Sequence, residues 1–129
     1  MTLASHIAKF LLLLAIGFIL WVALSANPPR AGGLFDLDKL NHFGAFFVLA
    51  ALTDYAFLQA NLIWQKMAPL LCFGLSIEVM QYGVGYRYFE WLDLIADAAG
   101  LLCFLAVRGR FRSIFDPLIH KYFGAAKFE

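Results

Sequence analysis

Three segments of the sequence carry polar side chains whose types and spacing suit acid–base or ligand-binding chemistry. Each segment places two such side chains three or four residues apart, which puts both on one face of a helix. The pairs are Asp38 with His42, Glu78 with Gln81, and Asp93 with Asp97. A histidine among carboxylates suits proton transfer, so His42 and Glu78 are the candidate catalytic residues. Two carboxylates four residues apart repel each other unless a cation, a proton or a basic residue lies between them, and His42, Lys39 and Arg87 are the available bases. With the cation alternative, Asp93 and Asp97 are candidate ligands of a divalent cation.

Basic side chains near these pairs predict a site for an anionic group. A lysine or an arginine can hold a phosphate or a carboxylate, and the guanidinium of Arg87 can bind two carboxylate oxygens at once. We therefore also expect Arg87 to pair with Glu78 or Asp93. The candidate ligand-binding residues are Asp38, Lys39, Gln81 and Arg87.

Each of these residues also has a simpler structural explanation. Asp38 suits the N-cap of a helix, and the basic side chains suit contacts with lipid phosphates. A charged side chain at the centre of a membrane costs about 2.5–3.5 kcal/mol on insertion scales, so Glu78 and Asp97 are the members least easily explained as incidental. Outside the set, Asp54 is expected to pair with Lys66 or with a turn rich in backbone groups.

The elements that position these residues are predicted to be membrane helices. Of the 129 residues, 63% are hydrophobic and only 15% are charged. A soluble domain has about 25% charged residues, and a chain this short has too little interior to bury so many apolar side chains. A lipid bilayer is the alternative solvent. The net charge of +1, without a basic face, gives no indication of a nucleic-acid partner.

Four segments are apolar over about the 20 residues that a membrane-spanning helix needs. They are residues 7–24, 40–58, 64–81 and 90–107. Pro28 and Pro29 are expected to stop the first segment, because proline cannot continue the hydrogen-bond ladder of a helix. Gly83 and Gly85 are expected to end the third segment.

A change of character after the fourth segment predicts one further helix. Asp116 followed by Pro117 resembles an N-cap and a first-turn proline. Residues 113–128 are therefore predicted to form a short amphipathic helix on the membrane surface. The predicted fold is a single all-α domain over residues 1–129, a four-helix transmembrane bundle with a short amphipathic C-terminal helix.

The distribution of lysine and arginine predicts how this bundle lies in the membrane. Four spans place both termini on one side, and seven of the ten basic residues lie there. These seven are Lys9, Lys66, Arg108, Arg110, Arg112, Lys121 and Lys127. Basic residues concentrate on the cytoplasmic side, so both termini are expected in the cytoplasm and the candidate site is expected to face outward.

The spacing of these polar residues resembles a known family. The pattern Asp38-Lys39-x-x-His42, Glu78-x-x-Gln81, Arg87 and Asp93-x-x-x-Asp97-x-x-Gly100 is similar to that of the VanZ-like family of small bacterial membrane proteins. The resemblance covers roughly residues 37–105, and it departs from the family at Asp97, where asparagine is frequent. It implies a multi-pass protein of the bacterial inner (cytoplasmic) membrane that acts in the cell envelope. The founding role of the family is low-level resistance to the glycopeptide teicoplanin.

The residues and the resemblance together favour a cell-envelope protein with an outward-facing polar site for a lipid-linked or anionic headgroup. Membrane lipids, and a lipid-linked cell-wall precursor among them, are the expected partners. A membrane enzyme that acts on a lipid headgroup is the second hypothesis, with proton transfer by His42 and Glu78. A non-catalytic partner protein in a membrane assembly, or a homo-oligomer, is the third.

Overall fold

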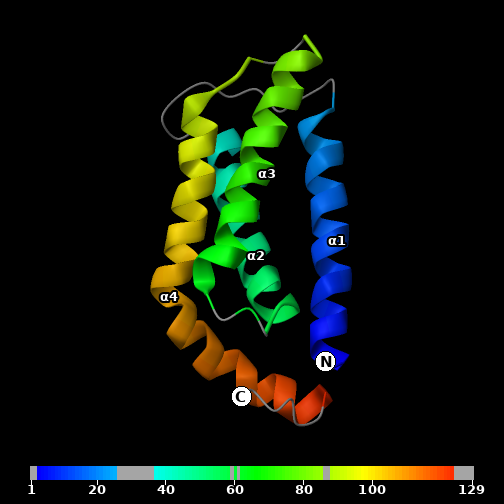
Figure 1. Cartoon of the computed structure of the whole chain (residues 1–129), viewed down its shortest axis with the longest axis vertical. Coiled ribbons are helices and arrows are strands. Elements are labelled where there is room, and N and C mark those ends of the chain that lie inside the picture. The colour runs from blue at the N-terminus through cyan, green and yellow to red at the C-terminus, as the bar shows by residue number, and fades with distance from the viewer. Residues whose placement is uncertain (1–2, 26–36, 59, 61, 86–87, 124–129) are drawn as a thin grey trace.

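The computed structural model of the chain describes residues 3–25, 37–58, 60, 62–85 and 88–123, and these residues form four helices and no strand. The helices are α1 (Leu3–Ala23), α2 (Leu37–Ala56), α3 (Ile63–Gly83) and α4 (Trp91–Phe123). They lie side by side as a bundle in which α3 covers α2 in the view of Figure 1. The predicted all-α, four-helix fold is confirmed, and the first three helices begin and end within four residues of the predicted bounds.

Glycine ends α3 as the sequence indicates. Gly83 is its last residue, and the backbone N–H of Val84 donates to the carbonyl of Met80 at 3.1 Å. Gly85 has a φ of 78°, a left-handed conformation that favours glycine. The N-cap prediction for Asp38 is wrong, because α2 already begins at Leu37. The Asp38 carboxylate instead lies in the first turn of α2, where the helix dipole stabilises negative charge.

The last helix differs from the prediction. The expected break after residue 107 and the separate amphipathic helix over residues 113–128 are wrong, because α4 runs unbroken to Phe123 and contains Pro117 in its interior. Asp116 does not cap a new helix, since its carboxylate accepts a hydrogen bond of 2.7 Å from the Tyr55 hydroxyl. The last part of α4 curves beneath the bundle towards the start of α1 (Figure 1). Residues 124–128 of the predicted helix lie outside the described residues.

The closest packing in the bundle is between α2 and α4. A Cβ atom added to Gly100 would overlap the carbonyl oxygen of Phe43, so the two backbones touch where only glycine fits. Phe46, Leu49 and Phe104 are almost fully buried beside the contact. The α2–α4 contact therefore fixes the relative positions of the polar side chains that these helices carry.

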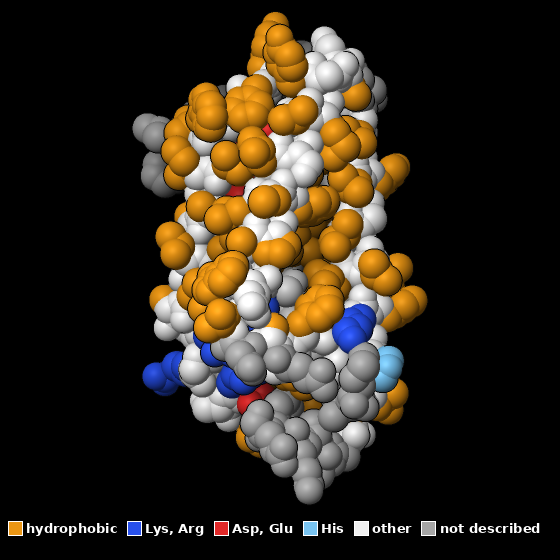
Figure 2. Space-filling model, in the orientation of Figure 1, with side chains coloured by type: hydrophobic (Ala, Val, Ile, Leu, Met, Phe, Trp, Pro, Cys, Tyr) orange, Lys and Arg blue, Asp and Glu red, His pale blue; other side chains and the backbone are white. Residues whose placement is uncertain are grey.

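The outside of the bundle is apolar over most of its length. Phe10, Leu13, Trp21 and Leu102 are each more than 60% exposed. Figure 2 shows apolar side chains over most of the visible face, with lysine and arginine gathered near its lower end. Among the described residues, only α1 is by itself long and apolar enough to cross a membrane.

Candidate functional site

Seven ionisable side chains meet where α2 and α4 begin and α3 ends, at the top of Figure 1. We call this group the acidic cluster: Asp38, Lys39, His42, Glu78, Glu90, Asp93 and Asp97. Six of its members were predicted from the sequence, and Glu90 was not. Of the other two predicted residues, Gln81 lies nearby and Arg87 lies outside the described residues, as do the expected pairings of Arg87 with Glu78 and Asp93.

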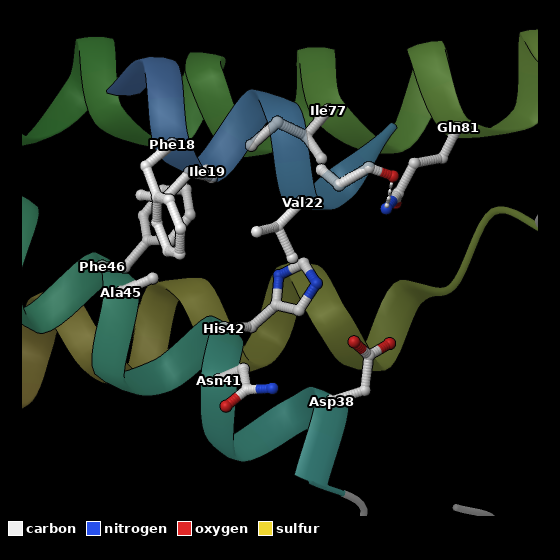
Figure 3. Close-up of a pocket in the computed structure, with 11 residues that line it drawn as sticks. Phe18, Ile19, Val22, Asp38, Asn41, His42, Ala45, Phe46, Ile77 and Gln81 are labelled. Carbon is white, nitrogen blue, oxygen red and sulfur yellow. Dashed lines mark hydrogen bonds between the residues drawn. The ribbon is translucent and has the colours of Figure 1, made fainter. Parts of the chain in front are cut away.

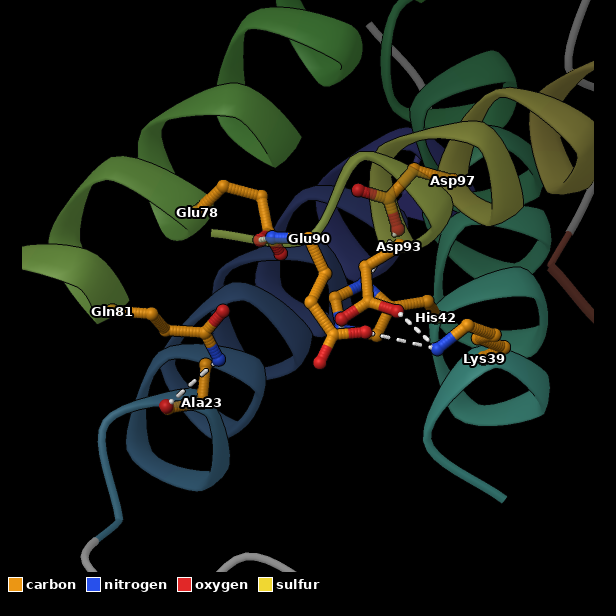
Figure 4. Close-up of polar contacts among 8 residues, drawn as sticks. All are labelled: Ala23, Lys39, His42, Glu78, Gln81, Glu90, Asp93 and Asp97. Atoms are coloured by element: carbon orange, nitrogen blue, oxygen red, sulfur yellow. Dashed lines mark hydrogen bonds and ion pairs between the residues drawn. The ribbon is translucent and has the colours of Figure 1, made fainter. Parts of the chain in front are cut away.

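His42 lies between two carboxylates of α4. Its Nδ1 is 2.8 Å from Oδ1 of Asp97, and its Nε2 is 3.8 Å from Oδ2 of Asp93. The imidazole lies beside two successive turns of α4, since Asp93 and Asp97 are one turn apart (Figure 4). The two predicted cation ligands therefore contact different nitrogens of one ring.

Lys39 neutralises the outer edge of the cluster. Its Nζ lies 3.1 Å from Oε2 of Glu90 and 3.3 Å from Oδ1 of Asp93. The hydrogen bond to Glu90, and the charge of Asp93 beside it, hold the pKa of the Lys39 ammonium above its ordinary value despite partial burial. The amine is therefore charged and engaged with carboxylates of the chain.

Glu78 is fully buried but does not pair with His42. Its Oε2 accepts a hydrogen bond of 3.0 Å from the backbone N–H of Glu90, which anchors the segment that leads into α4. Among the described residues no hydrogen bond joins Glu78 to His42, so the predicted proton-transfer pair is not in direct contact. The histidine has Asp97 as its hydrogen-bonding partner instead.

Gln81 ties two helices together at this end of the bundle. Its Nε2 donates a hydrogen bond of 3.0 Å to the carbonyl of Ala23, the last residue of α1, and its side chain is 2% exposed (Figure 4). A helix leaves its last carbonyls without partners in the helix itself, and the amide of Gln81 satisfies one of them.

The acidic cluster has more acid than base. Five carboxyl groups face one lysine and one histidine. Three buried carboxylate oxygens accept no hydrogen bond within the described part of the chain: Oε1 of Glu78, Oδ1 of Asp93 and Oδ2 of Asp97. Buried polar atoms are rarely left in this state, so each one calls for a bound partner, a proton or a functional reason.

A cavity of about 340 Å³ adjoins the cluster between α1, α2 and α3. Its walls are mostly apolar, and its polar end is formed by a small group of side chains (Figure 3). The apolar lining residues are Phe18, Ile19, Val22, Ala23, Ala45, Phe46 and Ile77, and the polar ones are Asp38, Asn41, His42 and Gln81. Apolar walls with a few polar groups at one end are typical of small-molecule sites.

A second ionic group lies at the opposite end of α2 and has the reverse balance of charge. We call it the basic cluster: Asp54, Lys66, Arg108 and Arg112. The Asp54 carboxylate is fully buried, accepts a hydrogen bond of 2.8 Å from Lys66 and is held by both Nε and Nη2 of Arg108 at 2.8 and 3.0 Å. Nε of Arg112 lies 3.1 Å from the same carboxylate. The expected pairing of Asp54 with Lys66 is confirmed.

The two arginines of the basic cluster were not predicted as partners of Asp54. They are four residues apart on α4 and thus share a face, so a buried acid on a neighbouring helix was the signal that could have revealed them.

Comparison with known proteins adds no assignment, because no protein-family model, curated protein or solved structure matches the chain. The VanZ-like resemblance stays a prediction from the spacing of the polar residues.

Proposed function

We propose that this chain is a multi-pass membrane protein that binds an amphiphilic ligand, with the polar headgroup at the acidic cluster and the apolar portion in the adjoining cavity. The cavity is the observation that carries the proposal. It passes from apolar side chains such as Phe18 and Ile77 to polar ones such as His42 and Gln81 over one continuous wall. A lipid or a lipid-linked precursor has the same transition from chain to headgroup.

The placement of charge supports a multi-pass arrangement. Helices α2, α3 and α4 are less apolar on average than α1, but several of their charged side chains are buried inside the bundle. Asp54, Glu78 and Asp97 are all fully buried, and Lys66 is 4% exposed. The outward surfaces of these helices keep apolar residues such as Val79 and Ile95. Charges within membrane segments face the bundle interior and pair there, so this pattern fits four spans better than one.

The basic cluster supports the orientation proposed for the bundle. It lies at the end of the bundle where α1 begins and α4 ends (Figure 1). Positive charge of this kind favours the cytoplasmic side. The acidic cluster then faces outward. Together with the VanZ-like resemblance, this points to the bacterial inner membrane and to a role in the cell envelope, with a lipid-linked cell-wall precursor as the ligand and glycopeptide resistance as the physiological setting.

A cavity-filling variant tests the proposal. Ala45→Phe places a ring in the cavity, and Val48→Phe places the same ring on the exposed side of α2 as the matched control. Binding of a fluorescent isoprenoid-phosphate lipid to the full chain in nanodiscs is expected to weaken at least tenfold in Ala45→Phe and to be unchanged in Val48→Phe. Equal binding by wild type and a folded Ala45→Phe protein would overturn the proposal.

A membrane enzyme acting on the same ligand is the second candidate. The hydrogen bond between Nδ1 of His42 and the Asp97 carboxylate favours it, because a buried carboxylate that orients an imidazole is a recurring arrangement in general-base catalysis. The expected signature is turnover of the bound lipid that is lost in His42→Ala while lipid binding persists. Binding without turnover in the wild type would leave the binding role alone.

A further inference from the structure

The geometry points to a divalent-cation site made by Asp38, His42 and Asp93, with Asp97 as the residue that positions the histidine. The site itself is independent of any lipid. The role we give it, to bridge the acidic cluster to an anionic headgroup, rests on the proposed function.

The three ligands converge from two helices. One ligand atom from each of Asp38, His42 and Asp93 lies within 4.8 Å of the other two. Nitrogen and oxygen ligands about 2.1 Å from a tetrahedral ion lie about 3.4 Å from each other. Oδ2 of Asp93 is 3.8 Å from Nε2 of His42, so a small side-chain rotation brings both atoms to this separation. Asp38 and His42 are one turn apart on α2 and present their side chains to the same end of the cavity (Figure 3).

The histidine is oriented as a metal ligand would be. Its Nδ1 is engaged with the fully buried Asp97 at 2.8 Å, which leaves Nε2 directed towards Asp93. A ligating histidine generally donates its other N–H to a carboxylate, which fixes the tautomer and the direction of the ring. Gly74 of α3 makes room for this arrangement, because a side chain at that position would collide with Oδ2 of Asp97.

A second observation is the separation between Asp93 and His42. The Asp93 side chain is 3% exposed, and its Oδ2 lies 3.8 Å from Nε2 of His42, which is too long for a hydrogen bond. Lys39 balances Asp93 from the Oδ1 side, at 3.3 Å, whereas Oδ2 faces the histidine. A cation between Oδ2 and Nε2 would therefore not take the position of the lysine.

The charge and the donor set define the class of ion. The acidic cluster carries three more carboxylates than it has basic groups, and a doubly charged ion offsets most of this excess. One imidazole with two carboxylates suits Zn²⁺, Mn²⁺ or another first-row divalent ion better than Mg²⁺ or Ca²⁺, which prefer oxygen ligands alone. Three protein ligands leave coordination positions open, and the cavity provides the space for a phosphate oxygen to fill one of them.

Metal binding by the full chain, without added lipid, tests the site. Purified protein stripped with EDTA is titrated with Co²⁺, whose visible spectrum reports coordination geometry, and with Zn²⁺ in competition. We expect one ion per chain and at least tenfold weaker binding in His42→Gln and Asp93→Asn. Asp116→Asn is the control of equal charge change, since Asp116 lies outside the acidic cluster and its amide can still accept from Tyr55, and its affinity should stay within threefold of the wild type.

Asp97→Asn tests the positioning role separately. We expect about 10–100-fold weaker binding and an altered Co²⁺ spectrum, as loss of a carboxylate that orients a metal ligand generally produces, with a melting temperature no lower than that of the wild type. A melting temperature of the wild type that rises with added Zn²⁺ provides a measurement that needs no variant.

The outcomes separate this inference from the proposed function. A folded wild-type chain that binds no ion at millimolar Co²⁺ or Zn²⁺ overturns the site, as does an equal loss of affinity in Asp116→Asn and Asp93→Asn, which would indicate general attraction to negative charge. Lipid binding that is insensitive to EDTA overturns the bridging role and leaves the proposed function intact. Metal binding without lipid binding confirms the site and removes the headgroup as its partner.

Discussion

The two ionic clusters lie at opposite ends of the same pair of helices and solve the burial of charge in opposite ways. In the basic cluster a single buried carboxylate, Asp54, is surrounded by Lys66, Arg108 and Arg112. Each of its oxygens contacts a cation of the chain. In the acidic cluster the described cations leave three buried carboxylate oxygens without a hydrogen bond.

This difference is the reason why we propose that the basic cluster is a structural network and the acidic cluster a ligand site. A buried charge with full partners is stable within the chain, and its removal leaves several groups of opposite charge unpaired. A buried carboxylate oxygen without a hydrogen bond raises the free energy of the folded chain unless something from outside binds to it. The basic cluster therefore acts as the anchor of the bundle, and the acidic cluster is where a ligand is expected.

Removal of the Asp54 carboxylate should have the largest effect on the stability of the fold. Asp54→Asn leaves three buried or half-buried cations without their shared carboxylate, and we expect the free energy of unfolding to fall by about 3–5 kcal/mol. Thermal unfolding of the purified chain in detergent measures it. A melting temperature equal to that of the wild type would show that the basic cluster is not an anchor.

The second largest loss of stability is expected at the close contact between α2 and α4, which lies between the two clusters. Gly100→Ala forces α2 and α4 apart at Phe43, at a cost of about 1–3 kcal/mol for overpacking. Gly109→Ala on the same helix is the control, because an added Cβ there meets no atom within 4 Å and alanine favours the helix by up to about 1 kcal/mol. Equal stability of the two variants would mean that the close contact does not hold the clusters in place.

The hydrogen bond that holds the end of α4 should contribute less. Tyr55→Phe removes the donor to Asp116, with an expected loss of about 0.5–1.5 kcal/mol and faster cleavage by trypsin within the last turns of α4. Tyr122→Phe, at an exposed position, should change neither quantity. Identical cleavage rates in both variants would show that the curved end of α4 is held by other contacts.

The smallest effect on stability is expected in the acidic cluster. Asp97→Asn keeps an acceptor for the His42 ring and removes one negative charge from a cluster that has an excess of them, so its melting temperature should match or exceed that of the wild type. A fall as large as that of Asp54→Asn would erase the distinction between the two clusters. The same variant is expected to lose metal affinity, so stability and binding should move independently.

The sequence predicts the helices well because their signals are local. Apolar length, glycines at the end of α3 and charges at helix ends all act within a few residues, and the observed bounds follow them. The error after residue 107 has the opposite origin. Asp116 and Pro117 look locally like a helix start, but Asp116 has a partner at Tyr55 that is 61 residues away. Contacts over such a separation do not register in the local pattern.

In the candidate site, too, the local features were predicted and the contacts between distant residues were not. Helical spacing correctly gathers residues such as Lys39, His42 and Asp93 at one end of the bundle. It does not reveal that His42 bonds to Asp97 rather than to Glu78, because that choice depends on how α2 and α4 are rotated about their axes. The close contact at Gly100 sets this rotation, and the glycine was recognised in the sequence without its partner, Phe43.

The wide spacing of the Asp54 partners along the chain has a consequence for biosynthesis. Arg108 lies 54 residues after Asp54, so at about 5–20 residues per second the ribosome adds it roughly 3–11 s later. Lys66 follows after only 12 residues. In the membrane setting proposed here, the lysine is the first counter-ion that Asp54 meets during insertion, and the two arginines add their contacts to this pair only when the last helix arrives.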